Sequence, residues 1–346
     1  MDNKITKRRL SDFLAYEWIL MLVAAIGVII ALELLYGALA VKLSMGQSFK
    51  YYYDENIDTV ISGDFRSVLE YETGKNGKTF SYDVLELSSE NLLSSYNVLS
   101  ARLSAKDGDM IFTDTLNDGE TDDAGYDKTV RARTVIDSFQ MYTFEGLLTD
   151  AQDYLATFLK EGVKTGDKAT DRVLAVSYDN LDGEKIDANF LKRMKKDNRY
   201  RTAESKAAGK VLERERIEKL CDQVKDFNTV MTVGDGLGLF YRYTKYEQIK
   251  TATERNNDNS KETYNTLYLK EIDAGRGNAA YGLKLDKLTG GTDASAYFRV
   301  LGESTAKNVV LCAFSFKGDP EYTPDLEFER ISFINTIIRQ CSNILG

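Results

Sequence analysis

The sequence predicts an α/β protein in which one N-terminal transmembrane helix precedes a large domain with two lobes. Three observations support this fold class. Residues 18–41 are apolar except for one charge, strand and helix patterns alternate after them, and roughly 300 residues from 42 to 346 exceed the usual size of a single core. The expected organisation is a tail at 1–17, a membrane anchor at 18–41 and a domain at 42–346.

Length and hydropathy together predict the anchor. The 24 residues of 18–41 include 13 Leu, Ile or Val. As a helix they would span about 36 Å, enough for a hydrocarbon core of about 30 Å. These side chains favour insertion by several kcal/mol, whereas one acidic side chain at the bilayer centre costs about 3 kcal/mol. Insertion is therefore expected despite Glu33.

A basic cluster before the anchor predicts its orientation. Basic residues stay on the cytoplasmic side, so we expect the domain outside the cell membrane. Glu33 lies toward the outer end, where it either reaches the interface or contacts a helix of a membrane partner. The cluster consists of Lys4, Lys7, Arg8 and Arg9.

Cleavage of the N-terminal segment is the alternative. Residues 38–40 have the small-x-small form of a cleavage site, and 18–32 would serve as the apolar region of a signal peptide. Against this, the leader contains Asp12 and Glu17, and the apolar run continues past Glu33. We therefore expect an uncleaved anchor.

Composition excludes several classes of function. The domain carries 41 Lys and Arg against 50 Asp and Glu, and this net charge of −9 is unsuited to nucleic acid. The chain has no histidine, which removes Ser-His and Cys-His pairings and the commonest metal ligand. We expect no enzyme, no cofactor and no metal site. Although Cys312 and Cys341 could pair, we expect them and Cys221 to be buried thiols.

The first elements of the domain predict a parallel unit. A β-prone segment at 47–53 is expected to form the first strand, and alternating apolar residues favour a strand at 78–87. Ser88 or Ser89 then caps a helix, and 110–113 forms a short buried strand. Strand, helix and strand in this order are typical of a parallel β-α-β unit.

The remainder of the domain is expected to mix helices and strands. Apolar residues at helical spacing predict helices, and short β-prone runs predict strands. The helices are expected at 145–160, 184–232 and 326–345, and the strands at 172–178, 280–285, 297–301 and 309–316. A polar turn or loop is expected at 255–261.

Three motifs suggest ligands, and structural roles explain each better. The Gly-rich run at 234–238 lacks the spacing of a dinucleotide fingerprint and follows a helix, so we expect a helix end. In the acidic run at 114–123, Leu116 would occupy a ligand position of an EF-hand, which leaves a solvated loop or an irregular calcium site. The basic cluster at 192–201 is expected to be a solvated helix face, with anionic lipid or a cell-wall polymer as the alternative.

Residues 85–114 resemble a segment of extracellular solute-binding proteins of the type 2 periplasmic-binding fold. In both, a strand leads to a helix that ends in a Gly/Asp turn, and a short apolar strand ends in Thr-Asp. Residues 141–155 look like the next helix of such proteins. The resemblance implies two lobes with a cleft between them. Its implied ligand-binding residues are Thr113 and Asp114 at the cleft mouth and Tyr52 and Tyr142 in the cleft wall.

The expected function is binding of a small-molecule ligand outside the cell. The protein would then serve an ABC transporter or a receptor, and closure of the two lobes over the ligand would be its mechanism. A non-catalytic assembly subunit of a membrane protein complex is the alternative. In both cases the partners include the lipid bilayer, through residues 18–41, and exclude nucleic acid.

Overall fold

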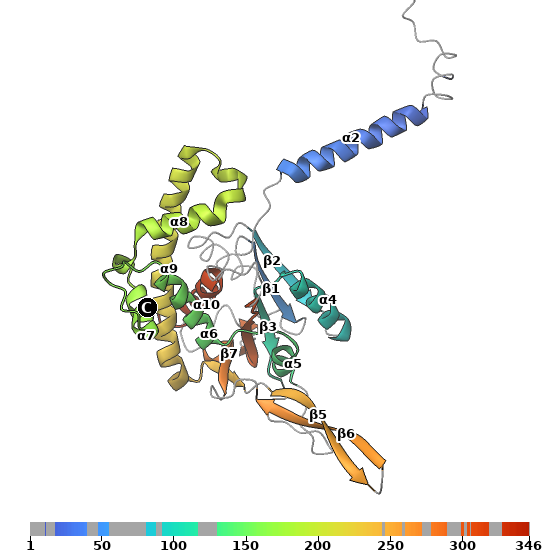
Figure 1. The fold of residues 1–346 in the computed structure, drawn as a ribbon, viewed down its shortest axis with the longest axis vertical. Helices are drawn as coiled ribbons and strands as arrows, with labels where there is room; N and C mark the ends of the chain where they lie inside the picture. The colour runs from blue at the N-terminus through green and yellow to red at the C-terminus, as the bar shows by residue number, and fades with distance from the viewer. Residues whose placement is uncertain are drawn as a thin grey trace, which may run out of the picture. The chain divides into compact units, whose positions relative to one another are not determined.

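The computed structural model contains two compact units, Met1–Leu43 and Ser44–Gly346 (Figure 1). The structure describes residues 11, 18–39, 48–54, 81–87, 92–116, 130–243, 246–257, 260–271, 278–288, 299–300, 303–304, 306–317 and 327–345. The predicted Asp-rich loop at 114–123 lies largely outside these residues.

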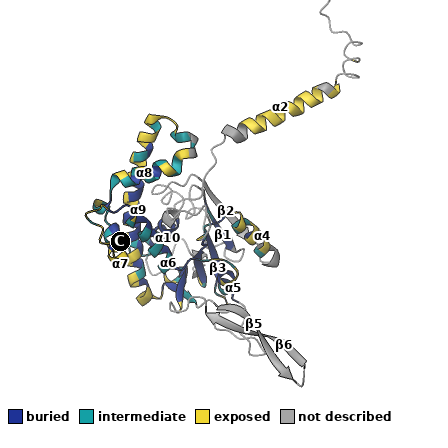
Figure 2. Ribbon diagram, in the orientation of Figure 1, coloured by how far each residue is buried: buried dark blue, intermediate teal, exposed yellow. Residues whose placement is uncertain are grey.

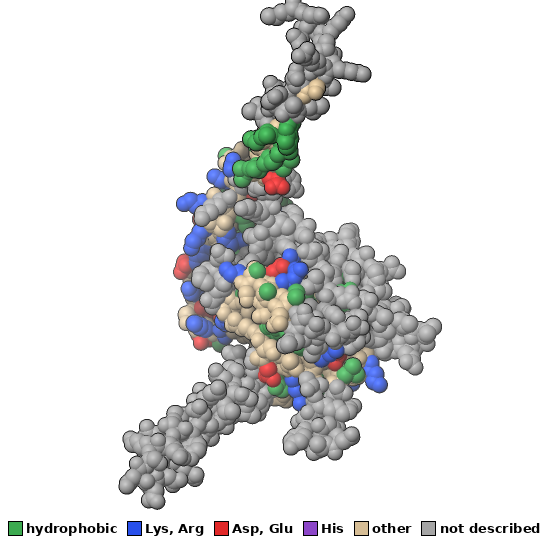
Figure 3. Space-filling model, turned by 90° about the vertical axis from the view of Figure 1, so that its right-hand side faces the viewer, with side chains coloured by type: hydrophobic (Ala, Val, Ile, Leu, Met, Phe, Trp, Pro, Cys, Tyr) green, Lys and Arg blue, Asp and Glu red, His purple; other side chains and the backbone are tan. Residues whose placement is uncertain are grey.

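The first unit contains helix α2, Trp18–Leu39, which is 22 residues long. Its described side chains are exposed, Glu33 included, and hydrophobic side chains form a dense band along it (Figure 3). The structure describes the side chains of α2 without interruption only over residues 21–35. Among the residues whose side chains are described, no helix is both long enough and apolar enough to cross a membrane.

A six-stranded mixed sheet forms the centre of the second unit. Its strands are β1 (Ser48–Asp54), β2 (Ser81–Leu87), β3 (Met110–Asp114), β4 (Phe240–Tyr243), β7 (Ala279–Lys284) and β10 (Val309–Ala313). They lie in the order β2-β1-β3-β10-β7-β4. Strand β10 is antiparallel to both of its neighbours, and β4 is antiparallel to β7. The predicted α/β class is confirmed.

The predicted parallel unit is confirmed with one addition. Strand β2 leads through helix α4 (Leu92–Ser104) to β3, as the sequence indicated. Strand β1 lies between β2 and β3 and is parallel to both. The β-α-β connection therefore crosses over one strand.

The sheet separates two cores because successive strand residues point to opposite faces. Tyr51 and Phe112 pack in the core that holds helices α6 (Phe144–Ala156), α9 (Ala203–Leu237) and α10 (Glu327–Cys341). Their neighbours in β1 and β3 pack on the other face, against α4 and α5 (Arg131–Ser138). The central strands β3 and β10 are buried on both faces (Figure 2). The two predicted lobes are not confirmed, since Ser44–Gly346 is one compact unit.

The strand predicted at 172–178 is wrong, because α7 (Lys168–Ala175) is a helix. Its Val and Leu residues suggested a strand, but Val173 is 72% exposed and borders no sheet. The Asp167 carboxylate accepts a hydrogen bond from the backbone N–H of Thr170 and caps the helix. Capping therefore outweighs the β-propensity of this short segment.

The long helix predicted at 184–232 is two helices. Helix α8 (Gly183–Arg193) is followed by the 3₁₀ turns η3 (Met194–Lys196) and η4 (Asn198–Tyr200) before α9 begins. Thr202 and Ser205 form a capping box at the start of α9. Gly238, with a φ of 66°, ends α9, which confirms the helix end expected from the Gly-rich run.

The sequence did not indicate a long hairpin that follows β4. Strands β5 (Tyr246–Asn257) and β6 (Ser260–Glu271) pair with each other throughout, and the predicted turn at 255–261 contains their connection. They form a separate two-stranded sheet. Within the strand predicted at 297–301, the structure describes β8 (Arg299–Val300), which pairs with β9 (Glu303–Ser304).

All three cysteines are free and buried, as expected. Burial raises the pKa of the Cys221, Cys312 and Cys341 thiols to about 12. The thiols are therefore protonated and inert at neutral pH.

Candidate functional site

Tyr52, which the resemblance to solute-binding proteins places in a cleft wall, lies in the core of the second unit. Its side chain is 1% exposed on the α4 face of β1, and its hydroxyl donates a hydrogen bond to the carbonyl of Asp107. Gly108, with a φ of 151°, permits this approach, because a Cβ at that position would overlap the Tyr52 ring. Burial raises the pKa of the Tyr52 phenol to about 12.

Thr113 and Asp114 are also buried, at the C-terminal end of β3. Thr113 is 0% exposed, and its hydroxyl has no hydrogen-bond partner among the described residues. The Asp114 carboxylate accepts a hydrogen bond from the Leu116 N–H at 3.0 Å and lies 3.6 Å from Nε of Arg131. Burial nevertheless raises its pKa. Neither Thr113 nor Asp114 belongs to the lining of the two pockets described below.

Tyr142, the fourth implied residue, lies near the opposite end of β3. Its backbone N–H donates to the Ala313 carbonyl at 2.9 Å, and its hydroxyl donates to Asp150 at 3.3 Å. The preceding residue, Met141, forms an antiparallel β-bridge with Phe314. Tyr142 therefore anchors a chain segment at the start of β3, far along the strand from Asp114.

A pocket of about 210 Å³ opens beside that segment. We call it the aromatic-serine pocket. Helix α4, the end of α5 and the chain after β10 form its walls. It is lined by Ser100, Leu103, Ser104, Ser138, Phe139, Gln140, Phe314, Ser315 and Phe316.

Packing of aromatic rings sets the shape of the aromatic-serine pocket. The rings of Phe139 and Phe314 meet edge to face with their centroids 6.2 Å apart. The Tyr52 ring packs edge to face against Phe314, with the centroids 6.1 Å apart. Backbone hydrogen bonds also tie the two walls, since Ser315 N–H donates to the Gln140 carbonyl at 2.8 Å. Tyr52 therefore contacts the pocket wall through Phe314 and is not itself part of the lining.

A buried ion pair stands behind the pocket. Arg330 of α10 is 0% exposed, donates to Asp109 at 3.1 Å and lies over the ring of Phe316 at 5.8 Å. Asp109 also accepts a hydrogen bond from the Lys50 N–H at 2.9 Å. Burial raises the pKa of Asp109, and the positive charge of Arg330 opposes that shift. Arg330 thereby holds Phe316 in place.

The chemistry of the pocket suits binding. Its lining consists of phenyl rings, one Leu, hydroxyls and one amide, and none of these groups titrates near neutral pH. Such a surface can stack on an apolar face and hydrogen-bond to hydroxyl groups. Among the described residues, no group of three Cys, Asp or Glu side chains could hold a metal ion.

Comparison with known proteins identified no relatives. No protein-family model matches the chain, and neither the curated proteins nor the solved structures give a significant match. We therefore infer function from the geometry of the chain itself.

Proposed function

We propose that this chain is a single-pass membrane protein whose second unit stands outside the cell and binds a small uncharged polar solute. The aromatic-serine pocket is the proposed binding site. The protein is non-catalytic in this proposal, since the pocket lining offers no nucleophile–base pair.

The proposed anchor is α2. A helix of 22 residues is about 33 Å long, which matches a hydrocarbon core of about 30 Å. Its sequence contains one charge, and its described side chains are exposed. Burying this surface in lipid would stabilise it. The basic residues before α2 support a cytoplasmic N-terminus.

The observation that carries the binding proposal is the lining of the aromatic-serine pocket. Three phenylalanines and four serines surround about 210 Å³ without any ionisable group. This volume is below the range of about 300–1,000 Å³ that drug-sized ligands occupy. A monosaccharide, which combines a hydrophobic ring face with several hydroxyls, has the complementary chemistry.

A thermal-shift screen of the full chain in uncharged detergent tests this proposal, with sugars, amino acids, peptides and calcium as the panel. A solute at about 100 times its Kd should stabilise the second unit by about 2.7 kcal/mol. Replacing Ser100 by Trp should abolish that stabilisation, because the indole would fill the pocket that Ser100 lines.

Val98→Trp is the matched control for Ser100→Trp. Val98 lies on the same helix, is 44% exposed and is not part of the pocket lining. It should leave the response to the solute unchanged. If no solute stabilises the wild-type chain, or if Ser100→Trp responds as well as Val98→Trp, the pocket is not a solute site.

A second candidate function is assembly with another membrane protein, which the β5–β6 hairpin favours. Its strands are twelve residues each, and among the described residues they pair only with each other. An isolated two-stranded hairpin is marginally stable in water, so a partner surface would stabilise it. Closure between two lobes remains a prediction of the resemblance to solute-binding proteins.

Glu33 allows a test of the assembly function within α2. It is the one charged residue of the helix and is exposed. If it contacts a partner helix in the membrane, Glu33→Leu should remove that partner from the purified complex. Unchanged co-purification would mean that Glu33 has no such contact.

A further inference from the structure

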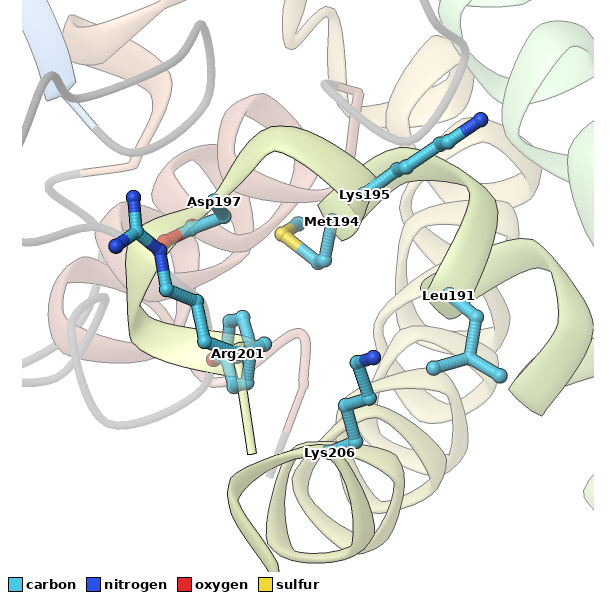
Figure 4. A pocket seen from close by; sticks show the side chains of 7 residues that line it. Leu191, Met194, Lys195, Asp197, Arg201 and Lys206 are labelled. Carbon is cyan, nitrogen blue, oxygen red and sulfur yellow. The ribbon is translucent and has the colours of Figure 1, made fainter. Parts of the chain in front are cut away.

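A second pocket lies between α8 and the start of α9. The segment 183–210, which we call the helical finger, reverses direction through η3 and η4 and leaves a hollow of about 600 Å³ (Figure 4). Its lining comes from both helices and from the turns between them. The lining residues are Leu191, Met194, Lys195, Asp197, Tyr200, Arg201 and Lys206.

Local packing preforms this hollow. The rings of Phe190 and Tyr200 meet edge to face at 5.0 Å and join the end of α8 to η4. Gly209 of α9 gives these rings room, because a Cβ there would overlap both of them. The capping box of Thr202 and Ser205 fixes the start of α9. A ligand therefore need not order the finger before it binds.

The helical finger concentrates positive charge in an acidic chain. Residues 183–210 hold nine Lys or Arg and four Asp or Glu, a net charge of +5, whereas the whole chain has −9. Such segregation creates a local potential that attracts anions.

Ion pairs neutralise part of this positive charge. Arg193 pairs with Glu213, and Arg199 pairs with Asp197 at 2.6 Å. The hydrogen bond from Arg199 lowers the pKa of Asp197, so its carboxylate stays ionised and balanced by Arg199. Asp197 therefore does not cancel the remaining cations of the lining.

Lysine side chains supply the remaining charge. Lys195 and Lys206 are exposed, and their ammonium groups form no hydrogen bond or ion pair with the residues that the structure describes. Figure 4 shows Lys206 extending toward the hollow from α9 and the sulfur of Met194 facing it from η3, whereas the Lys195 side chain extends away from the hollow. Leu191 and Met194 give the hollow an apolar side. Cationic and apolar groups thus line the same space.

We propose that the hollow of the helical finger binds the phosphate group of an anionic ligand, with Lys206 as its charged contact. Lysine ammonium groups are strong point-charge donors to phosphate oxygens. The apolar side would contact the rest of an amphiphilic ligand. An anionic phospholipid headgroup and free phosphate share this chemistry. This site is separate from the aromatic-serine pocket and does not depend on solute binding there.

Calorimetric titration of the full chain in uncharged detergent tests the proposal. The probes are inorganic phosphate, a short-chain phosphatidylglycerol and a short-chain phosphatidylcholine, whose phosphate is balanced by its own cation. We expect phosphatidylglycerol to bind and phosphatidylcholine to bind at least about tenfold more weakly, since a charged hydrogen bond contributes about 1.5–3 kcal/mol. Added salt should weaken binding.

Lys206→Glu should weaken phosphatidylglycerol binding at least about tenfold. Lys225→Glu is the matched control: it makes the same charge change on the same helix, at a side chain that is 54% exposed and outside the pocket lining. Circular dichroism should show both variants folded. Binding of phosphate with the same dependence on Lys206 would support recognition of the phosphate group, and binding of phosphatidylglycerol alone would support a lipid headgroup.

Any one of three outcomes would overturn the proposal. The first is that neither anionic probe binds the wild-type chain. The second is that Lys206→Glu binds phosphatidylglycerol as well as Lys225→Glu does, and the third is that phosphatidylcholine binds as well as phosphatidylglycerol.

Discussion

Replacing Arg330 by Leu is expected to destabilise the second unit by about 3–5 kcal/mol, because Asp109 would keep a buried charge without its partner. The Arg330 side chain is 0% exposed and the Asp109 side chain is 16% exposed, so water can replace little of the lost interaction. The free energy of unfolding of native proteins is about 5–15 kcal/mol, so this loss is a large fraction of the stability. Urea unfolding of the full chain, followed by circular dichroism, measures it.

Two variants separate the buried pair from a general effect of removing an arginine. Arg339→Leu removes an arginine of the same helix that pairs with Asp226, but both side chains are 33% exposed, so it should cost at most about 1 kcal/mol. Adding Asp109→Asn to Arg330→Leu should restore part of the loss, because the buried charge is removed. Equal losses for Arg330→Leu and Arg339→Leu would contradict the assigned role of Arg330.

Placing arginine at both Val28 and Ile29 is expected to release the chain from the membrane. Each arginine at the centre of a spanning helix costs about 2.5–3.5 kcal/mol, so the pair costs about 5–7 kcal/mol. The thirteen Leu, Ile and Val of the predicted anchor contribute about 4–8 kcal/mol on the same scale, which the pair would largely cancel. Alkaline carbonate extraction of cell membranes measures the outcome.

Leucine at both positions is the control for this substitution, since it keeps the helix apolar. The wild-type chain and the leucine variant should stay in the carbonate-resistant fraction, and the arginine variant should leave it. An extractable wild-type chain would show that α2 does not span the membrane.

Local patterns predicted much of the fold. The strands β1, β3 and β10 are short runs that are buried on both faces, and such runs are recognisable by composition alone. The hairpin was missed because its strands are mostly polar and show no apolar alternation. The strand expected at 172–178 failed because a cap at Asp167 decided the structure of a segment with mixed propensity.

The candidate sites depend on tertiary contacts that the sequence does not display. The aromatic-serine pocket joins residues such as Ser100, Phe139 and Phe314, which lie far apart in the chain. Of the four implied ligand-binding residues, Tyr52 supports the pocket wall, whereas Thr113 and Asp114 lie toward the other end of β3. In contrast, the basic cluster was visible in the sequence, but the hollow that makes it a candidate site required the turn between α8 and α9.

Cysteine labelling in intact cells tests the central claim most directly, namely that the second unit stands outside a membrane that α2 crosses. The three native thiols are buried and inert, so the label would report only an introduced cysteine. Val173→Cys is suitable because Val173 is 72% exposed, and Ser11→Cys marks the N-terminal tail. A membrane-impermeant maleimide should label Val173→Cys in intact cells and Ser11→Cys only after permeabilisation. Labelling of Val173→Cys only after permeabilisation would contradict the account.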